Sequence, residues 1–151
     1  MKKFLIFSIV IFTFPAFANP YKHWSKKKMH EYSHSLAGKV ENHLAIEQLG
    51  EFGSHFALVV YRTGTGTSEW HDDYTDFYVV QAGEATLHTG GKIVDPKEVG
   101  PGEIRGEAIK GGKTTLLKSG DTVNIPPKTP HHIVIEPGKS ITYMILKIRR
   151  K

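Results

Sequence analysis

Cysteine is absent from the 151-residue sequence, so no disulfide bond can hold the fold together. After residue 14 no apolar run is long enough to cross a bilayer, which excludes a transmembrane helix in the mature chain. Nucleic-acid motifs are absent, and basic residues do not interleave with aromatic ones in the middle of the chain. The formal charge is +5, and the basic excess lies at residues 26–28 and 147–151, as in solvated tails. These absences indicate a small protein held together by its core, with or without a metal.

The first 18 residues have the organisation of a secretory signal peptide. A basic start at residues 2–3 precedes an apolar run over residues 4–14, and the sequence AFA at residues 16–18 is a small-x-small cleavage site. The run is too short to cross a bilayer, which favours a cleaved signal over an uncleaved anchor. We therefore expect cleavage after Ala18 and a periplasmic or secreted protein that consists of residues 19–151.

A short helical segment is followed by many short strands. Ser25 can cap the start of the helix, and Gly38 lies near its end. Apolar or β-branched runs then occur at residues 44–46, 56–61, 77–80, 85–87, 114–117, 122–125, 133–135 and 141–148, separated by turn signals such as Gly83. This pattern predicts an all-β sandwich or barrel. We assign residues 19–43 to an N-terminal helical segment and 44–151 to a β-domain, with a long surface hairpin or loop between Lys92 and Lys113.

Residues 30–34, HEYSH, match the H-E-x-x-H motif of zinc peptidases. In that motif two histidines one helical turn apart bind zinc, and the glutamate is the general base. The apolar stripe of this helix is formed by Met29, Tyr32, Leu36 and Val40, and it should face the core. His30 and His34 fall on nearly the opposite side, beside lysines. We expect an exposed face here and keep a zinc peptidase that uses Glu31 as one alternative.

Two segments far apart carry better candidates for a metal site. The first, EWHDDYTD at residues 69–76, holds one histidine and four acidic residues. In a strand, Glu69 and His71 point to the same side. The second segment spans residues 120–132, where a Gly-Asp turn opens a strand, prolines break it, and two histidines begin the next. His131 and His132 point in opposite directions, so one of them should enter the interior.

Together these segments resemble the two motifs of the cupin family, G-x5-H-x-H-x3,4-E-x6-G and G-x5-P-x-G-x2-H-x3-N. The spacing is kept by Glu69, His71, Asp76 and Gly83 in the first motif and by Gly120, Pro126 and His131 in the second. Some residue types differ from the motifs. Glu69 replaces the first histidine and Asp76 replaces the glutamate, while Lys128 replaces a glycine and Ile135 replaces the asparagine. The resemblance covers residues 44–148 and is greatest for small exported cupins with E-x-H-x4-D and IP-x3-PH motifs.

The resemblance implies a double-stranded β-helix, or jelly-roll barrel, with a metal bound inside its mouth and, by family analogy, a homodimer. Carried over by position, the metal ligands are Glu69, His71, Asp76 and His131. Two nitrogens and two carboxylates suit a divalent transition metal such as Fe, Mn, Zn or Ni. A rival set is His71, Asp73 and His131, the facial triad of non-haem iron oxygenases. Replacement of such ligands is also how cupins lose their metal, so a metal-free barrel is a third alternative.

The function that the resemblance implies is that of a small-molecule enzyme of the isomerase, lyase or oxygenase type. A metal would polarise an oxygen of the substrate, and Asp73 or Glu69, whichever does not bind metal, can move protons. Tyr78 is the second candidate catalytic residue, although its position also suits the core. Glu103 and Arg105 can form a salt bridge over the barrel mouth. The alternative is a non-catalytic ligand-binding or structural cupin, whose site would be closed and lack a reachable base.

Overall fold

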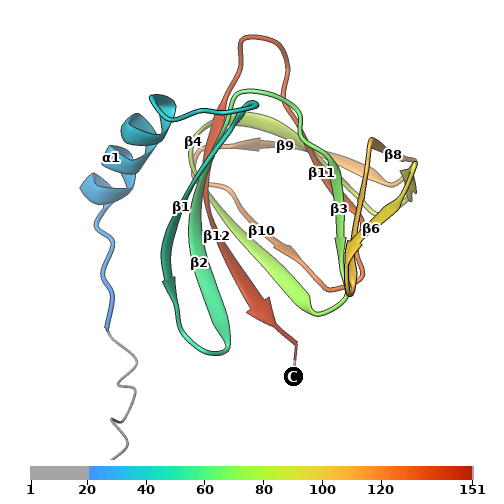
Figure 1. The fold of residues 1–151 in the computed structure, drawn as a ribbon. Helices are drawn as coiled ribbons and strands as arrows, with labels where there is room; N and C mark the ends of the chain where they lie inside the picture. Colours follow the sequence, from blue (N-terminus) through green and yellow to red (C-terminus); the bar gives the residue numbers. More distant parts are fainter. Residues whose placement is uncertain (1–20, 151) are drawn as a thin grey trace, which may run out of the picture.

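The computed structural model describes residues 21–150, in which one helix precedes a β-barrel (Figure 1). The elements are α1 (Lys26–Ala37), β1 (Leu44–Glu51), β2 (His55–Arg62), β3 (Ser68–His71), β4 (Tyr74–Thr89), β5 (Lys92–Val94), β6 (Lys97–Gly100), β7 (Glu103–Gly106), β8 (Ala108–Lys110), β9 (Lys113–Lys118), β10 (Thr122–Ile125), β11 (His131–Val134) and β12 (Ile141–Arg149). The predicted signal peptide lies outside the described residues. Helix α1 lacks the length and apolar character that a membrane span requires.

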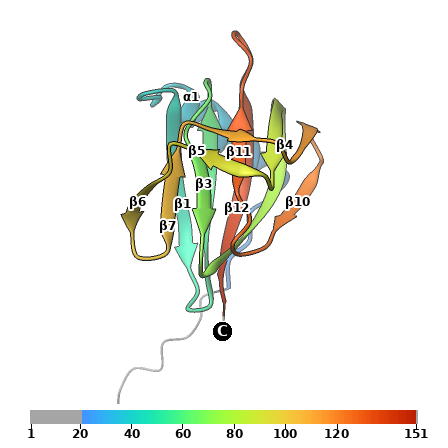
Figure 2. The same ribbon diagram turned by 90° about the vertical axis from the view of Figure 1, so that its right-hand side faces the viewer.

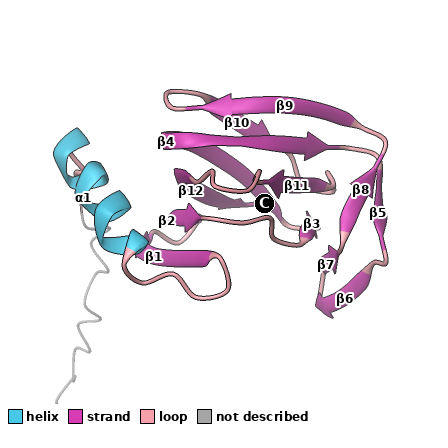
Figure 3. Ribbon diagram, turned by 90° about the horizontal axis from the view of Figure 1, so that it is seen from above, coloured by secondary structure: helices cyan, strands magenta, loops and turns pink. Residues whose placement is uncertain are grey.

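The strands form a curled antiparallel sheet in the order β1-β2-β12-β4-β11-β3-β7-β6, and β9 and β10 also pair with β4. Strands β1 and β2 lie on one side of the barrel, and β3 and β11 on the other (Figure 1). Strand β3 lies between β7 and β11 (Figure 2). Seen from above, α1 flanks one end of the barrel, while β5 and β8 lie at the other (Figure 3). The predicted all-β jelly-roll barrel with a short N-terminal helix is confirmed.

Strand β4 belongs to both sides of the barrel. Its first part pairs with β12 and β10, and its last six residues, from Glu84 on, pair with β9. The change occurs at Gly83, whose φ of 75° is a left-handed conformation. A Cβ at this position would overlap the backbone carbonyl oxygen of Ser140, so glycine is required for close approach as well. The prediction of a turn at Gly83 between two strands was therefore wrong, because one long strand bends there.

The core fills the inside of the barrel, and a smaller cluster attaches the helix. Buried inward-facing residues include Val60, Tyr78, Val80, Leu87, Leu117, Ile125, Ile133, Ile141, Tyr143 and Ile145. Met29 and Leu36 of α1 pack with Ala45 and Val59, and Tyr32 and Val40 lie against them. The predicted apolar stripe of α1 is confirmed. Its predicted N-cap is also confirmed, because Ser25 Oγ accepts a hydrogen bond from the backbone N–H of Lys28 at 3.2 Å.

The segment between Lys92 and Lys113 is more regular than the sequence suggested. Strand β5 pairs with β8, and inside this hairpin β6 pairs with β7. Strand β7 also pairs with β3, which extends the barrel sheet and places Glu103 opposite His71. Of the two predicted alternatives, a long hairpin or a loop, the structure has the hairpin. The segment contributes a wall of the barrel, and one of its residues reaches the site.

Candidate metal centre

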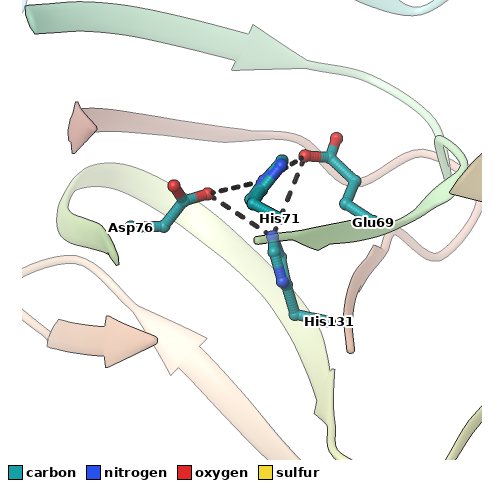
Figure 4. Close-up of side chains that lie close together, drawn as sticks. All are labelled: Glu69, His71, Asp76 and His131. Atoms are coloured by element: carbon teal, nitrogen blue, oxygen red, sulfur yellow. Dashed lines mark ion pairs between the residues drawn. The ribbon is translucent and has the colours of Figure 1, made fainter. Parts of the chain in front are cut away.

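Four side chains converge inside the barrel, and they are the four that the cupin motifs single out. Glu69 and His71 come from β3, Asp76 from β4 and His131 from β11 (Figure 4). One ligand atom of each residue lies within 4.8 Å of those of the other three. Strand pairing produces this arrangement, since His131 is the register partner of Glu69. The side chains of His71, Asp76 and His131 are 3%, 1% and 3% exposed, so the donors are held in a nearly dry interior.

Both histidines turn their Nε2 atom toward the group of four. His131 Nδ1 donates to the backbone carbonyl of Thr129 at 3.0 Å, which leaves Nε2 as the inward atom. That Nε2 is buried and has no hydrogen-bond partner among the described residues. His71 Nδ1 lies 2.6 Å from Oε2 of Glu103, and its Nε2 also faces the group. Metal-binding histidines are oriented in the same way, by a carbonyl or carboxylate on the far nitrogen. The donor set therefore fits a divalent metal.

The ammonium group of Lys147 lies against the same donors. Lys147 Nζ is 2.8 and 2.9 Å from the two carboxylate oxygens of Asp76, to which it donates, and 2.8 Å from Nε2 of His71. Lys147 on β12 is the register partner of Asp76 and borders the same cavity as Tyr143 and Ile145. The side chain of Lys147 is only 15% exposed. The prediction of a solvated basic tail over residues 147–151 was therefore wrong at its first residue.

Burial and charge oppose each other in this group. Burial disfavours ionised Glu69, but the hydrogen bond with His71 and the charge of Arg105 outweigh it and lower the pKa of Glu69 to about 2. Burial also opposes the ionisation of Asp76, yet His131, His71 and Lys147 hold the pKa of Asp76 well below its usual range. Both carboxylates are therefore ionised at neutral pH. For His71, burial lowers the pKa, but hydrogen bonds to Asp76 and Glu69 raise it to about 9.

A cavity of about 400 Å³ borders this group and is lined by Glu69, His131 and Lys147. Apolar side chains of β1, β2 and β12 form much of its wall, together with two arginines. Arg62 Nη2 lies 3.8 Å from Glu69 Oε1, and Arg105 Nη1 lies 3.3 Å from Glu69 Oε2. The Nη1 atom of Arg105 is buried and makes no hydrogen bond within residues 21–150. The cavity thus combines an apolar wall with two arginines that are ion-paired with Glu69.

The other predicted site residues have different positions. Asp73 is exposed in the two-residue turn between β3 and β4, so the structure does not bring it to the two histidines as the rival ligand set required. Tyr78 lines the cavity, and its hydroxyl lies 3.5 Å from Asp76 Oδ2. Burial raises the pKa of Tyr78, so its phenol stays protonated. The catalytic roles of Asp73 and Tyr78 stay predictions.

The H-E-x-x-H match forms no comparable site. His30 and His34 lie on the exposed side of α1, with their Nε2 atoms 3.1 Å apart. Among residues 21–150, no third histidine, cysteine or acidic side chain joins them in a cluster that could hold a metal. The histidines of a peptidase would lie in a walled cleft, whereas these face solvent beside Lys26 and Lys27.

Two residues of the site were missed from the sequence. Glu103 was assigned only to a salt bridge with Arg105, which does form at 3.5 Å, but it also contacts His71. Lys147 was assigned to a tail. Strand alternation could have found it, because residues 143, 145 and 147 lie on one face of the last strand and the first two are apolar.

Comparisons with known proteins show similarity only at the level of the fold. No protein-family model matches the chain, and no curated protein matches it. The polyketide cyclase RemF from Streptomyces resistomycificus has a TM-score of 0.51 at 15% identity, over 73% of this chain and 69% of that chain. The nucleoside dehydratase Pac13 from Streptomyces has a TM-score of 0.52 at 10% identity, over 74% of each chain.

A third solved structure carries the family name. A cupin 2 conserved barrel domain protein from Rhodopseudomonas palustris has a TM-score of 0.51 at 15% identity, over 72% of this chain and 63% of that chain. The chain spans only 47% of the DMSP lyase DddQ from Ruegeria pomeroyi, at 23% identity and a TM-score of 0.48. The curled antiparallel barrel and these structural neighbours show that this chain has the fold of a cupin barrel.

Proposed function

We propose that this protein is a metal-dependent enzyme for small molecules. The observation that carries the proposal is the convergence of four donors, including the unpartnered Nε2 of His131, at the edge of a cavity of about 400 Å³. Cavities of this size hold ligands of ordinary metabolite dimensions. Neighbours of the same fold that are described as a polyketide cyclase and a nucleoside dehydratase support a small-molecule substrate.

The four donors would hold a divalent transition metal. Two imidazole nitrogens and two carboxylate oxygens suit Fe, Mn, Zn or Ni, and both carboxylates are ionised at neutral pH. When bound, such a metal supplies Lewis acidity that polarises a carbonyl, carboxylate or enolate oxygen of a substrate. Isomerase, lyase and oxygenase reactions can all use this activation, and the geometry does not favour one of them.

The side chains of the cavity would bind and orient the substrate. Arg62 and Arg105 offer guanidinium groups on the cavity wall, and Arg105 Nη1, which is 3.3 Å from Glu69 Oε2, makes no hydrogen bond within residues 21–150. An anionic substrate group, such as a carboxylate, matches these donors. Apolar residues such as Leu58 and Ile145 would contact the rest of the molecule and exclude water. Lys147 Nζ lies where a proton can be delivered.

A non-catalytic cupin is the second candidate, and Lys147 is the observation that favours it. Lys147 already neutralises Asp76 and contacts His71, so four donors and a lysine can form a closed polar cluster. Such a protein would bind a ligand in the cavity without turning it over. We further propose that the chain is exported, which N-terminal sequencing of the expressed full-length protein would test by showing whether it starts after Ala18.

Metal analysis of purified protein tests the proposed function. We expect about one equivalent of a divalent metal in the wild type after reconstitution, and its loss in His71→Ala and in His131→Ala. His30→Ala, on the exposed face of α1, is the matched control and should keep the metal. The metal-loaded and chelator-treated proteins are then compared on a panel of small enolisable carboxylic acids. A wild type that takes up no metal would sink the proposal, and metal without turnover would favour the binding protein.

A further inference from the structure

The ammonium group of Lys147 contacts His71 and Asp76 at atoms that a metal would need as ligands. Lys147 Nζ lies 2.8 Å from His71 Nε2, and the far nitrogen of this imidazole is held by Glu103 at 2.6 Å. An imidazole nitrogen has a single in-plane lone pair. His71 Nε2 can therefore bind a proton, the lysine N–H or a metal, but only one of them at a time.

The carboxylate of Asp76 is likewise unable to bind Lys147 and a metal freely at the same time. Its side chain is 1% exposed, and both of its oxygens accept hydrogen bonds from Lys147, at 2.8 and 2.9 Å. A second cation bound to this buried carboxylate would repel the ammonium strongly, since few water molecules screen the two charges. The charge of Asp76 is thus already neutralised by the chain itself.

The side chain of Lys147 also has room to move. It is 15% exposed and borders the cavity, whereas the side chains of His71 and Asp76 are 3% and 1% exposed and do not line the cavity. Its four-carbon stem lets the ammonium swing into the cavity without any shift of the backbone. The structure thus contains both the competing contact and a path for releasing it.

We propose that Lys147 is a built-in competitor for the metal: divalent ions enter the group of four only when the ammonium leaves Asp76 and His71. The inference rests on the proposed metal site and adds a control on its occupancy. It requires that a neutral residue at position 147 increases metal affinity at constant pH, because the metal no longer has to displace a cation.

Titration with Co²⁺ alone, followed by its visible absorption, measures this affinity without any substrate. The chelator-treated wild type is compared at one pH with Lys147→Met and Lys147→Gln, the latter keeping a neutral N–H donor for Asp76. Lys113→Met, at an exposed position of β9, is the control for loss of one positive charge. We expect both neutral variants to bind Co²⁺ at least about tenfold more tightly than the wild type and the control.

The results separate this inference from the metal site itself. Equal Co²⁺ affinity in the wild type and the Lys147 variants, together with loss of binding in His71→Ala, would leave the site standing and overturn the competitor. Weaker binding in the neutral variants would also overturn it, because Lys147 would then be a ligand. No binding in any variant would overturn both proposals. A Lys147 variant that folds only with Co²⁺ supports the competitor, since the metal then replaces the missing ammonium.

Discussion

Nδ1 of His71 lies 2.6 Å from Oε2 of Glu103, a residue on the neighbouring strand β7. The contact directs Nε2 of His71 into the barrel, toward Glu69 and Asp76. Because β7 is the register partner of β3, the hairpin between β5 and β8 holds a ligand of the proposed site in place. The outer wall of the barrel thus takes part in building the candidate metal centre.

Glu103→Gln should weaken metal binding without abolishing it. The neutral amide orients His71 less firmly and makes its Nε2 a poorer donor, and loss of such an orienting carboxylate costs about 10- to 100-fold in metal affinity. Titration with Co²⁺ measures the change. Glu98→Gln, an exposed change on the adjacent strand β6, is the matched control and should bind like the wild type. Unchanged affinity in Glu103→Gln would show that strand packing alone orients His71.

Arg105→Met should weaken the binding of a small carboxylate to the metal-loaded protein. Arg105 Nη1 lies beside the cavity and makes no hydrogen bond within residues 21–150, so it can donate to a carboxylate, and loss of such a charge-assisted hydrogen bond costs about tenfold or more in affinity. Calorimetry with benzoate, which has only one carboxylate, measures the effect, and metal content is checked in each sample. Arg149→Met, an exposed change at the end of β12, is the control. Equal benzoate affinity in all three proteins would remove Arg105 from the binding site.

Acid should destabilise the metal-free protein through Asp76 and Glu69. Their pKa values are lowered in the fold, so the stability they contribute is present above the unfolded value of about 4 and is lost as the pH falls through the folded values. Asp76→Asn removes the charge that faces Lys147 and should cost about 3–5 kcal/mol near neutral pH. Urea unfolding measures the free energy of unfolding, and the difference between Asp76→Asn and the wild type should decrease as the pH falls.

The control for this measurement is Asp95→Asn, an exposed change in the turn between β5 and β6. Asparagine tolerates the left-handed backbone at this position, so stability should change little at any pH. A gap between Asp76→Asn and the wild type that stays constant down to about pH 3 would contradict the assignment of the acid sensitivity to Asp76.

Gly83→Ala should be more destabilising than Gly138→Ala. Both glycines have a positive φ, 75° and 79°, so alanine pays a similar backbone penalty of about 1–2 kcal/mol at each. A Cβ at Gly83 would also overlap the carbonyl of Ser140, whereas one at Gly138 meets no atom within 4 Å. Thermal unfolding of the two variants separates the clash from the backbone cost. Equal losses of stability would show that β4 and the β11–β12 loop move apart without penalty.

Much of the fold could be predicted from local patterns. The alternation of apolar residues and the glycine and proline turns place most of the strands, and Ser25 and the apolar stripe place α1. The bend of β4 could not be predicted, because a glycine that ends a strand and one that bends it look alike in sequence. What separates them is the approach of the Ser140 backbone, which comes from a distant part of the chain.

The candidate site could be predicted in its members but not in its electrostatics. Motif spacing selected Glu69, His71, Asp76 and His131, and the structure brings these four together. Spacing favoured Asp76 over Asp73, and the structure shows the physical reason in the turn of only two residues between β3 and β4. Asp73 lies in that turn and faces solvent, whereas Asp76 lies within β4 and is buried.

Local residue order therefore accounts for the strands and their inward faces, because alternation and turn chemistry act over a few residues. The four donors were selected by their resemblance to the cupin motifs, and strand pairing brings them together. Strand register determines which other side chains lie next to the donors. It sets Lys147 opposite Asp76 and Glu103 opposite His71, partners 71 and 32 residues apart in the chain. Cross-strand neighbours of this kind depend on which strands pair and how they align, and only the folded sheet fixes both.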